Sequence, residues 1–163
     1  MTLTIGIDVG GTKVLGGVVD ATGKVLTTSR RDTPREGGKA LTQTIADVAL
    51  ELAAQHQVSA VGLSAAGFVS SDRKTMLATP NIAGWNGVQL DAELTALINL
   101  PVIIENDANA AAWGERSFGA GRGKENMLMV TVGTGVGGAI MINGEIYRGA
   151  TNFAGEFGHM RMG

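Results

Sequence analysis

The sequence predicts an α/β protein with a mixed sheet and helices on its faces, followed by the start of a second, similar unit. Residues 4–9 alternate apolar and polar side chains and pass through a glycine turn into strand patterns at residues 14–19 and 24–29, which predicts an antiparallel meander. After Gly38 the pattern changes to strands alternating with helices, which indicates crossover connections within the sheet. A chain of 163 residues with 44 % hydrophobic residues is long enough to bury such a core.

The alternating part is expected to contain three helices and two buried strands. The first helix is indicated by apolar residues at helical spacing, Leu41, Ile45, Val48 and Leu52. Further helices are expected at residues 90–98 and 108–115, and short buried strands at residues 60–64 and 102–104. Strands and helices that alternate along the sequence are typical of a sheet whose faces are covered by helices.

Two glycine turns in the sequence look like copies of each other. Residues 5–12, Ile-Gly-Ile-Asp-Val-Gly-Gly-Thr, align with residues 128–135, Leu-Met-Val-Thr-Val-Gly-Thr-Gly. In each copy an apolar strand leads into the turn, and a second strand, a polar turn and a third strand follow; Asn143-Gly144 is the polar turn of the second copy. An internal duplication is therefore expected.

The glycine-rich residues 119–123 have no periodicity and are the candidate linker between the copies. We therefore expect a first lobe at residues 1–118 and the opening strand meander of a second lobe at residues 119–163.

Composition excludes several classes of function. The net charge of -2, without a basic cluster, argues against a nucleic-acid-binding surface. No apolar run is long enough to cross a membrane, and the first residues lack the pattern of a signal peptide, so a cytoplasmic protein is expected. The chain has no cysteine, which excludes a disulfide or a thiolate metal site within it and fits a reducing cytosol.

The first glycine turn has reactive polar side chains on both sides. A glycine turn between strands brings backbone N–H groups together without side chains that would keep an anion away. Asp8, Thr12 and Lys13 add a carboxylate, a hydroxyl and an ammonium group, which a phosphate and a nearby Mg²⁺ would use. A plain hairpin with a charged rim is the alternative, but two such turns favour a phosphate clamp. Neither turn is a Walker A loop or a Rossmann fingerprint, because both of those lead from a strand into a helix.

Glu105-Asn106-Asp107 lies where an apolar strand ends and a helix begins. An aspartate in this position commonly caps the helix. The functional alternative is a general base at the carboxyl end of a strand, where open α/β sheets bind their ligands. The two roles are compatible.

Glu156 and His159 place a carboxylate and an imidazole three residues apart. On one side of a turn they could bind hydroxyl groups or contribute to a metal site, but two ligands are too few for a metal site and a solvated loop is the alternative. With aromatic residues at only 4 %, Trp85 and Trp113 are expected to be packing residues rather than platforms for a sugar.

These segments resemble, in order and spacing, the ROK family of sugar kinases, repressors and open reading frames, and within it the glucokinase branch. The matching residues cover essentially the whole chain: 5–13, 80–85, 105–115, 131–138 and 156–159. The resemblance implies an actin/hexokinase/Hsp70-like (ribonuclease H-like) fold. It further implies ATP- and Mg²⁺-dependent phosphorylation of a hexose, most simply glucose, at its 6-hydroxyl group.

The resemblance also implies roles for individual residues. Asp107 would be the catalytic base. The sugar would contact Gly67, Asn81, Asn106, Glu156 and His159. The phosphates and Mg²⁺ would be served by Asp8, Gly10, Gly11, Thr12 and Lys13, joined by Thr134 and Gly135.

Two departures from the family pattern bear on these expectations. Many members carry a cysteine-rich zinc motif after the element that matches residues 156–159, so a structural zinc with His159 as a ligand is expected only in a longer chain. The rest of the second lobe is expected beyond residue 163, so this chain alone should be inactive as a kinase. A homo-oligomer is expected, and the alternative function is a non-catalytic, sugar-responsive or self-associating half-domain.

Overall fold

The computed structural model describes residues 2–80, 82–133 and 135–161. Its packing divides the chain into two compact units, Met1–Asn106 and Asp107–Gly163. The unit boundary falls where the helix that follows Asn106 begins, because this helix packs on the strands after it rather than on those before it.

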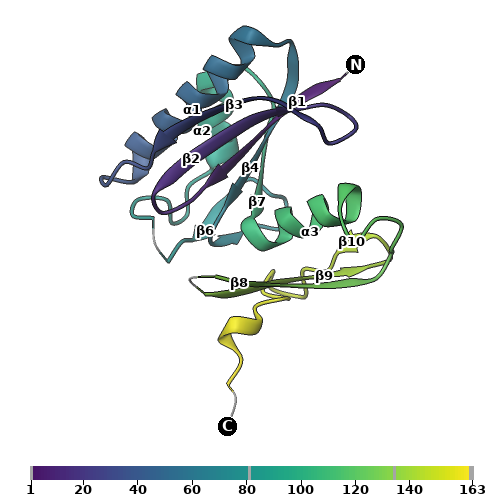
Figure 1. The fold of residues 1–163 in the computed structure, drawn as a ribbon. Coiled ribbons are helices and arrows are strands. Elements are labelled where there is room, and N and C mark those ends of the chain that lie inside the picture. Colours follow the sequence, from purple (N-terminus) through teal and green to yellow (C-terminus); the bar gives the residue numbers. More distant parts are fainter. Residues whose placement is uncertain (1, 81, 134, 162–163) are drawn as a thin grey trace. The chain divides into compact units, whose positions relative to one another are not determined.

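The first unit is built on a mixed five-stranded sheet with the order β3-β2-β1-β4-β7 (Figure 1). Strand β1 pairs antiparallel with β2 and parallel with β4, which in turn pairs parallel with β7, so the predicted meander and mixed sheet are confirmed. A separate two-stranded pair, β5 with β6, was not expected from the sequence. The strands are β1 (Leu3–Val9), β2 (Lys13–Val19), β3 (Val25–Asp32), β4 (Val58–Ala65), β5 (Phe68–Val69), β6 (Met76–Ala78) and β7 (Val102–Asn106).

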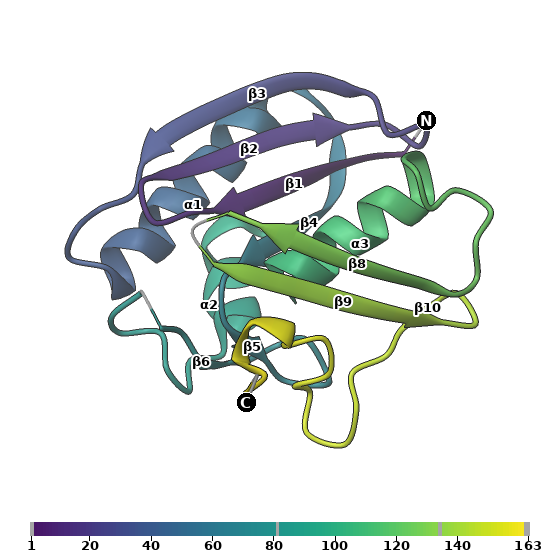
Figure 2. The ribbon, with the colours of Figure 1, turned by 60° about the horizontal axis from the view of Figure 1, so that its bottom comes forward.

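Two helices, α1 (Gly38–Gln55) and α2 (Leu90–Ile98), pack side by side on one face of this sheet (Figures 1 and 2). The predicted apolar face of α1 is fully buried: Leu41, Ile45, Val48 and Leu52. Burying one such side chain contributes about 1.5–3 kcal/mol. The face therefore holds the helix on the sheet.

The ends of these helices have local causes. Gly37 and Gly38 both have positive φ, 60° and 46°, so the chain turns sharply before α1 begins. Asn99 ends α2 in the left-handed conformation, and its backbone N–H bonds to the oxygen of Thr95. Pro101 follows, as expected for a helix that stops there.

Trp85 belongs to the core of the first unit. It is 1 % exposed, and its indole N–H donates a hydrogen bond to the hydroxyl of Thr42 on α1 (3.2 Å). The expectation that Trp85 is a packing residue is confirmed.

The second unit consists of α3 (Asp107–Phe118) on a three-stranded antiparallel sheet with the order β10-β9-β8 (Figure 2). Its strands are β8 (Met127–Val132), β9 (Val136–Ile142) and β10 (Glu145–Ile146), and a short 3-10 helix, η1, spans Phe157–His159. Buried alanines of α3 let the helix approach the sheet, and Trp113 packs in the same cluster. The arrangement repeats the meander of the first unit, with a much shorter third strand.

The turn between β9 and β10 is the predicted hairpin turn. Asn143 and Gly144 both have positive φ, 53° and 79°, which is the backbone of a type I′ turn. The N–H of Gly144 donates to the oxygen of Glu125 (2.7 Å), so the turn is tied to the segment that precedes β8.

Strand β8 is an edge strand with an apolar face that the second unit leaves uncovered. Leu128 is 62 % exposed, Val130 50 % and Val132 83 %. A groove of about 530 Å³ runs between β8 and α3, lined by Glu115 and Lys124 among others. An open edge and an apolar face are features that favour association.

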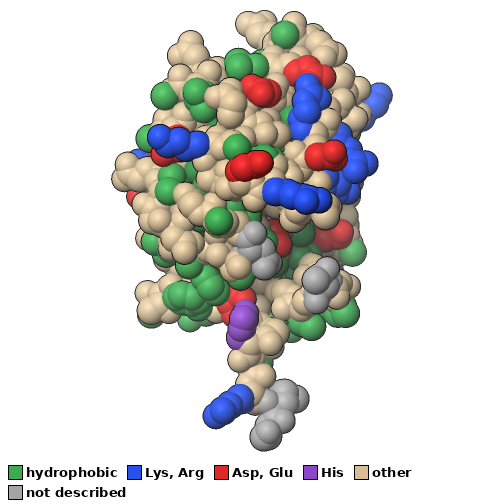
Figure 3. All heavy atoms as spheres, turned by 90° about the vertical axis from the view of Figure 1, so that its left-hand side faces the viewer, with side chains coloured by type: hydrophobic (Ala, Val, Ile, Leu, Met, Phe, Trp, Pro, Cys, Tyr) green, Lys and Arg blue, Asp and Glu red, His purple; other side chains and the backbone are tan. Residues whose placement is uncertain are grey.

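Charged side chains are mixed on the face drawn in Figure 3. Lys and Arg side chains stand among Asp and Glu side chains in the upper part of this view. Within the described ranges, no helix has both the length and the apolar character that crossing a membrane requires.

Candidate functional site

The predicted site residues of the first unit lie at the carboxyl ends of its parallel strands. Val9, Ala65 and Asn106 are register partners across β1, β4 and β7, so the three strands end at the same edge of the sheet. One residue earlier, Asp8, Ser64 and Glu105 form the next row. Ligands of open α/β sheets bind at this kind of edge.

Asp8 is exposed at the end of β1, and within the described ranges one side chain bonds to its carboxylate. The hydroxyl of Ser64 donates to Oδ1 of Asp8 at 3.1 Å. Among the described residues, Oδ2 of Asp8 accepts no hydrogen bond.

The glycine turn between β1 and β2 is held at both of its ends. The N–H of Gly10 donates to the oxygen of Lys13 at 2.9 Å. The backbone N–H of Thr33 donates to the oxygen of Thr12, and the hydroxyl of Thr33 donates to the oxygen of Gly10 (2.7 Å). The turn is thus fixed to the end of β3 and presents Asp8 and Lys13 on its two flanking strands.

Neither glycine of this turn is required by the protein's own backbone. Gly10 and Gly11 do not have positive φ. Among the described residues, a Cβ at Gly11 would have no atom within 4 Å, and one at Gly10 would touch the oxygen of Lys13 at 3.4 Å. In the part of the chain that the structure describes, neither a left-handed backbone nor a neighbouring atom requires glycine at these two positions, and open space lies in front of the turn.

Asn106 joins the end of β7 to the turn after β4. Its side-chain N–H donates to the backbone oxygen of Gly67 at 3.1 Å, and its own backbone N–H donates to Oε1 of Glu105 at 3.0 Å. Glu105 is 8 % exposed, so this carboxylate is buried beneath the edge. Sequence reasoning missed Glu105 and Ser64 as parts of the site, because nothing in a strand pattern distinguishes them from ordinary polar positions.

At position 67, by contrast, the backbone and its neighbours do require glycine. The φ of Gly67 is 140°, and a Cβ there would lie 2.6 Å from the oxygen of Ala78 on β6. The turn after β4 therefore packs directly on β6. Asn81, the other predicted sugar contact of this region, lies outside the described residues.

Asp107 is the first residue of α3 and belongs to the second unit. It is exposed, and its Oδ1 accepts a hydrogen bond from the N–H of Ala108 at 2.9 Å. This bond goes to the N–H of the next residue, whereas a capping side chain engages the N–H of the second or third helical residue, so it is not the bond of the predicted cap. The carboxylate faces solvent, as the predicted base requires.

The second glycine turn, between β8 and β9, closes with the N–H of Gly133 donating to the oxygen of Gly135 (2.9 Å). A Cβ at Gly135 would meet nothing within 4 Å, as at Gly11. Thr134 lies outside the described residues. Gly138, further along the same motif, has another role, because a Cβ there would lie 2.2 Å from the ring of Phe157.

That contact brings the segment of Glu156 and His159 onto β9. The imidazole Nε2 of His159 lies 3.9 Å from Oε2 of Glu156, and the side chain of His159 is 77 % exposed. The two groups face each other, as their spacing predicted. Within the described residues no group of three or more His, Cys, Asp or Glu side chains could hold a metal ion.

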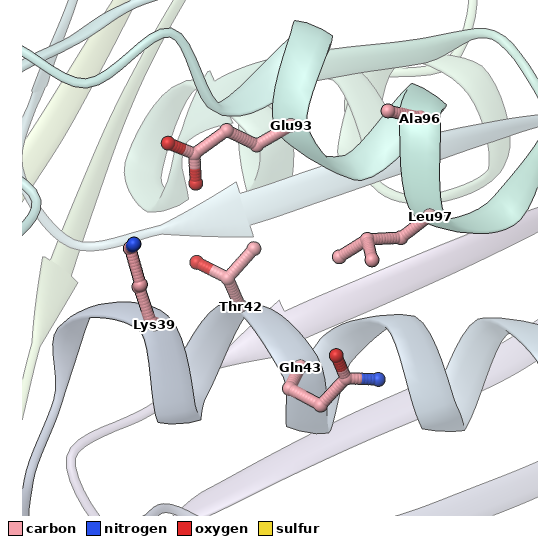
Figure 4. A pocket seen from close by; sticks show the side chains of 6 residues that line it. All are labelled: Lys39, Thr42, Gln43, Glu93, Ala96 and Leu97. Carbon is pink, nitrogen blue, oxygen red and sulfur yellow. The ribbon is translucent and has the colours of Figure 1, made fainter.

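A groove of about 380 Å³ lies apart from these residues, between α1 and α2 (Figure 4). Lys39, Thr42 and Gln43 line it from one helix. Glu93, Ala96 and Leu97 line it from the other. None of the predicted site residues that the structure describes lines it.

The fold and the motifs together define a family. The model of the ROK family matches residues 4–163, and the chain belongs to this family. The chain is 46 % identical over 162 residues to the glucokinase of Streptomyces coelicolor and 32 % identical over 164 residues to the xylose repressor of Bacillus subtilis. It superimposes with a TM-score of 0.90, at 45 % identity, on the ROK family glucokinase of Streptomyces griseus solved with glucose and AMPPNP.

The chain spans only part of these relatives. The matches cover 99 %, 98 % and 98 % of this chain but 50 %, 42 % and 50 % of the two relatives and of the solved chain, respectively. The mixed sheet with its helices is the actin/hexokinase-like fold of the ROK kinases, and the predicted fold class is confirmed.

Proposed function

We propose that this chain is the N-terminal part of a ROK-type glucokinase, which transfers the terminal phosphoryl group of ATP to the 6-hydroxyl group of a hexose, with glucose as the substrate. The proposal is supported by the likeness to glucokinases and by one observation in the structure. Asp8 with its glycine turn and Asn106 with Gly67 end neighbouring parallel strands at one edge of a sheet, and Asp107 follows Asn106 directly.

On the sugar side, Asp107 accepts the proton of the 6-hydroxyl group while the hydroxyl oxygen attacks the terminal phosphorus of ATP. A carboxylate at the start of a helix suits this role, because it is exposed and held by the first turn. By match to the family motif, the residues that would contact the sugar hydroxyls are Asn106, Gly67, Asn81, Glu156 and His159.

On the donor side, backbone N–H groups of the turn at Gly10 and Gly11 hold phosphate oxygens, together with Thr12 and Lys13. Thr134 and Gly135 act in the same way from the second turn. When bound, ATP would supply the phosphoryl group and Mg²⁺ would offset its negative charge. Asp8 would hold the cation through its carboxylate, and the open space before Gly11 would leave room for the phosphate.

The proposed lobes are residues 1–118 and 119–163, with the second lobe continued in a longer chain. A structural zinc is proposed only for that longer chain, with His159 as one ligand. We further propose that the protein forms homo-oligomers.

The experiment that tests the function is a coupled assay of glucose 6-phosphate formation by a full-length protein that carries residues 1–163. Glucose should be phosphorylated with ATP and Mg²⁺. Polyphosphate serves as an alternative donor, and other hexoses serve as alternative acceptors. A protein that binds glucose in calorimetry but phosphorylates none of these hexoses would contradict the proposal.

That contrary result would favour a second candidate, a non-catalytic sugar-responsive protein. The likeness to the xylose repressor supports this alternative. It would make the same pocket a sensor in which Asp107 binds a sugar hydroxyl without accepting its proton.

A further inference from the structure

We infer that Ser64 is a positioning residue for the phosphate side of the site: its hydroxyl orients the carboxylate of Asp8 toward the nucleotide-bound cation. The inference rests on the proposed function for the identity of the ligand. Its structural basis is the hydrogen bond between two neighbouring parallel strands described above.

Ser64 and Asp8 are direct register partners on β4 and β1. Their side chains stand on the same face of the sheet, because residues opposite each other in a ladder point the same way. Ser64 donates to Oδ1 of Asp8 at 3.1 Å, and Ser64 is half-buried whereas Asp8 is exposed. The donor is therefore the better anchored of the two groups.

The carboxylate of Asp8 needs such an anchor. The terminal torsion of an aspartate side chain is broad, so an exposed carboxylate without a partner rotates freely. Among the described residues, Ser64 is the side chain that donates a hydrogen bond to Asp8. By engaging Oδ1, the hydroxyl leaves Oδ2 to face a cation or the water bound to that cation. The entropy lost in fixing the Asp8 carboxylate is then already lost before the ligand binds.

The neighbour of Ser64 on its other side is also acidic. Glu105 is the register partner of Ser64 on β7, and this carboxylate is 8 % exposed. It accepts the backbone N–H of Asn106 through Oε1. A serine between the two carboxylates separates them, and its single proton is directed to Asp8.

The same strand offers a matched control. Ser59 lies at the opposite end of β4 and donates to the backbone oxygen of Leu3 on β1, also at 3.1 Å. Ser59→Ala and Ser64→Ala thus each remove one serine hydroxyl and one hydrogen bond between the same two strands. Only Ser64 contacts Asp8.

The experiment uses the full-length protein with the variants Ser64→Ala, Ser64→Thr and Ser59→Ala. Calorimetry measures the affinity for AMPPNP in saturating Mg²⁺, and electron paramagnetic resonance measures Mn²⁺ binding in the presence of AMPPNP. Steady-state assays measure the Mg²⁺ concentration at half-maximal rate and the KM for glucose. Thermal unfolding reports on any structural effect.

Ser64→Ala should weaken Mn²⁺ and Mg·AMPPNP binding by about three- to tenfold, the scale of one ordinary hydrogen bond. It should raise the Mg²⁺ requirement of the reaction and leave the KM for glucose within about twofold. Ser64→Thr keeps a hydroxyl in a strand that favours β-branched residues, and it should restore cation binding. Ser59→Ala should bind both ligands like the unaltered protein.

Equal cation affinity in Ser64→Ala and Ser59→Ala would overturn the inference. So would a loss in Ser64→Ala that falls on glucose rather than on the cation. If the unaltered protein binds Mg·AMPPNP but phosphorylates no hexose, the proposed function fails. The binding measurements then decide the role of Ser64 on their own.

Discussion

The side-chain amide of Asn106 donates a hydrogen bond to the backbone oxygen of Gly67, at 3.1 Å, and so ties the end of β7 to the turn that follows β4. Both residues are proposed to contact the sugar. The bond links two segments that are far apart in the sequence, so the position of one proposed sugar contact depends on the other.

Asn106→Asp should disturb this link without changing the size of the side chain. The carboxylate places an acceptor where the amide donated, opposite another acceptor. We expect the affinity for glucose to fall about tenfold, since a hydrogen bond contributes about 0.5–1.5 kcal/mol and an unmatched pair costs more. Calorimetry with glucose measures the effect. Asn99→Asp, at the end of α2, is the control, and equal affinity in the two variants would contradict the prediction.

Asp107→Asn should abolish most of the turnover. Asparagine keeps the size of the side chain and can still bond to the N–H of Ala108, but it cannot accept the proton of the sugar. In the full-length enzyme kcat should fall about 10²–10⁴-fold, with little change in thermal stability. The control is Asp91→Asn, which removes an acidic group from the first turn of α2. Near-normal turnover of Asp107→Asn would show that Asp107 is not the catalytic base.

Gly11→Ala and Gly67→Ala should have opposite signatures. A methyl group at Gly11 contacts no atom of the described residues, so stability should be unchanged while the affinity for Mg·AMPPNP falls. A methyl group at Gly67 would clash with the oxygen of Ala78, and alanine is strained at the φ of 140° found there. The free energy of unfolding should therefore drop by about 1–3 kcal/mol or more. Denaturant unfolding and calorimetry separate the two effects. If Gly11→Ala lost glucose affinity and kept nucleotide affinity, the roles of the two loops would have to be exchanged.

Residues 1–163 expressed alone should self-associate and show no appreciable kinase activity. The apolar face of β8 and its open edge are uncovered within the second unit, with Val130 50 % exposed. Val130→Lys should therefore shift the mass in light scattering toward the monomer. A coupled glucose assay measures activity. A stable monomer of the unaltered chain with ordinary turnover would disprove both statements.

Stability of the first unit should fall in acid partly through Glu51. Hydrogen bonds from Ser29 and then from Arg31 hold the pKa of the Glu51 carboxyl below its ordinary value of 4.5. Because the pKa is depressed in the folded state, the stabilisation is present above pH 4.5 and is lost as the pH falls below it. Glu51→Gln should flatten this part of the profile of unfolding free energy against pH. An unchanged slope in that variant would exclude the contribution.

Much of the fold follows from local patterns. The apolar spacing of Leu41, Ile45 and Leu52 predicted the buried face of α1, and the strand alternation predicted the meander. The repeated glycine turns predicted that the second unit copies the meander of the first. These features depend on residues close in sequence, which periodicity reports directly.

The rest depends on contacts between distant residues. The pairing of β5 with β6 joins two short segments without alternation, and the bond from Ser64 to Asp8 requires a register between strands that no local pattern contains. Gly138 was read with the second glycine turn, whereas the ring of Phe157 packs on it. A glycine in a motif can serve packing as well as a ligand, and only the neighbours of its missing Cβ separate the two uses.

The hairpin turn at Asn143 and Gly144 has a chemical consequence for the ageing of the protein. Asparagine before glycine is the sequence in which the following backbone nitrogen most readily attacks the side-chain amide and releases ammonia. Here that nitrogen is engaged with the oxygen of Glu125 at 2.7 Å, and the type I′ backbone holds the asparagine in a fixed conformation. Deamidation at Asn143 therefore requires the hairpin to open. The deamidation rate should then report how often the second unit unfolds locally at this turn.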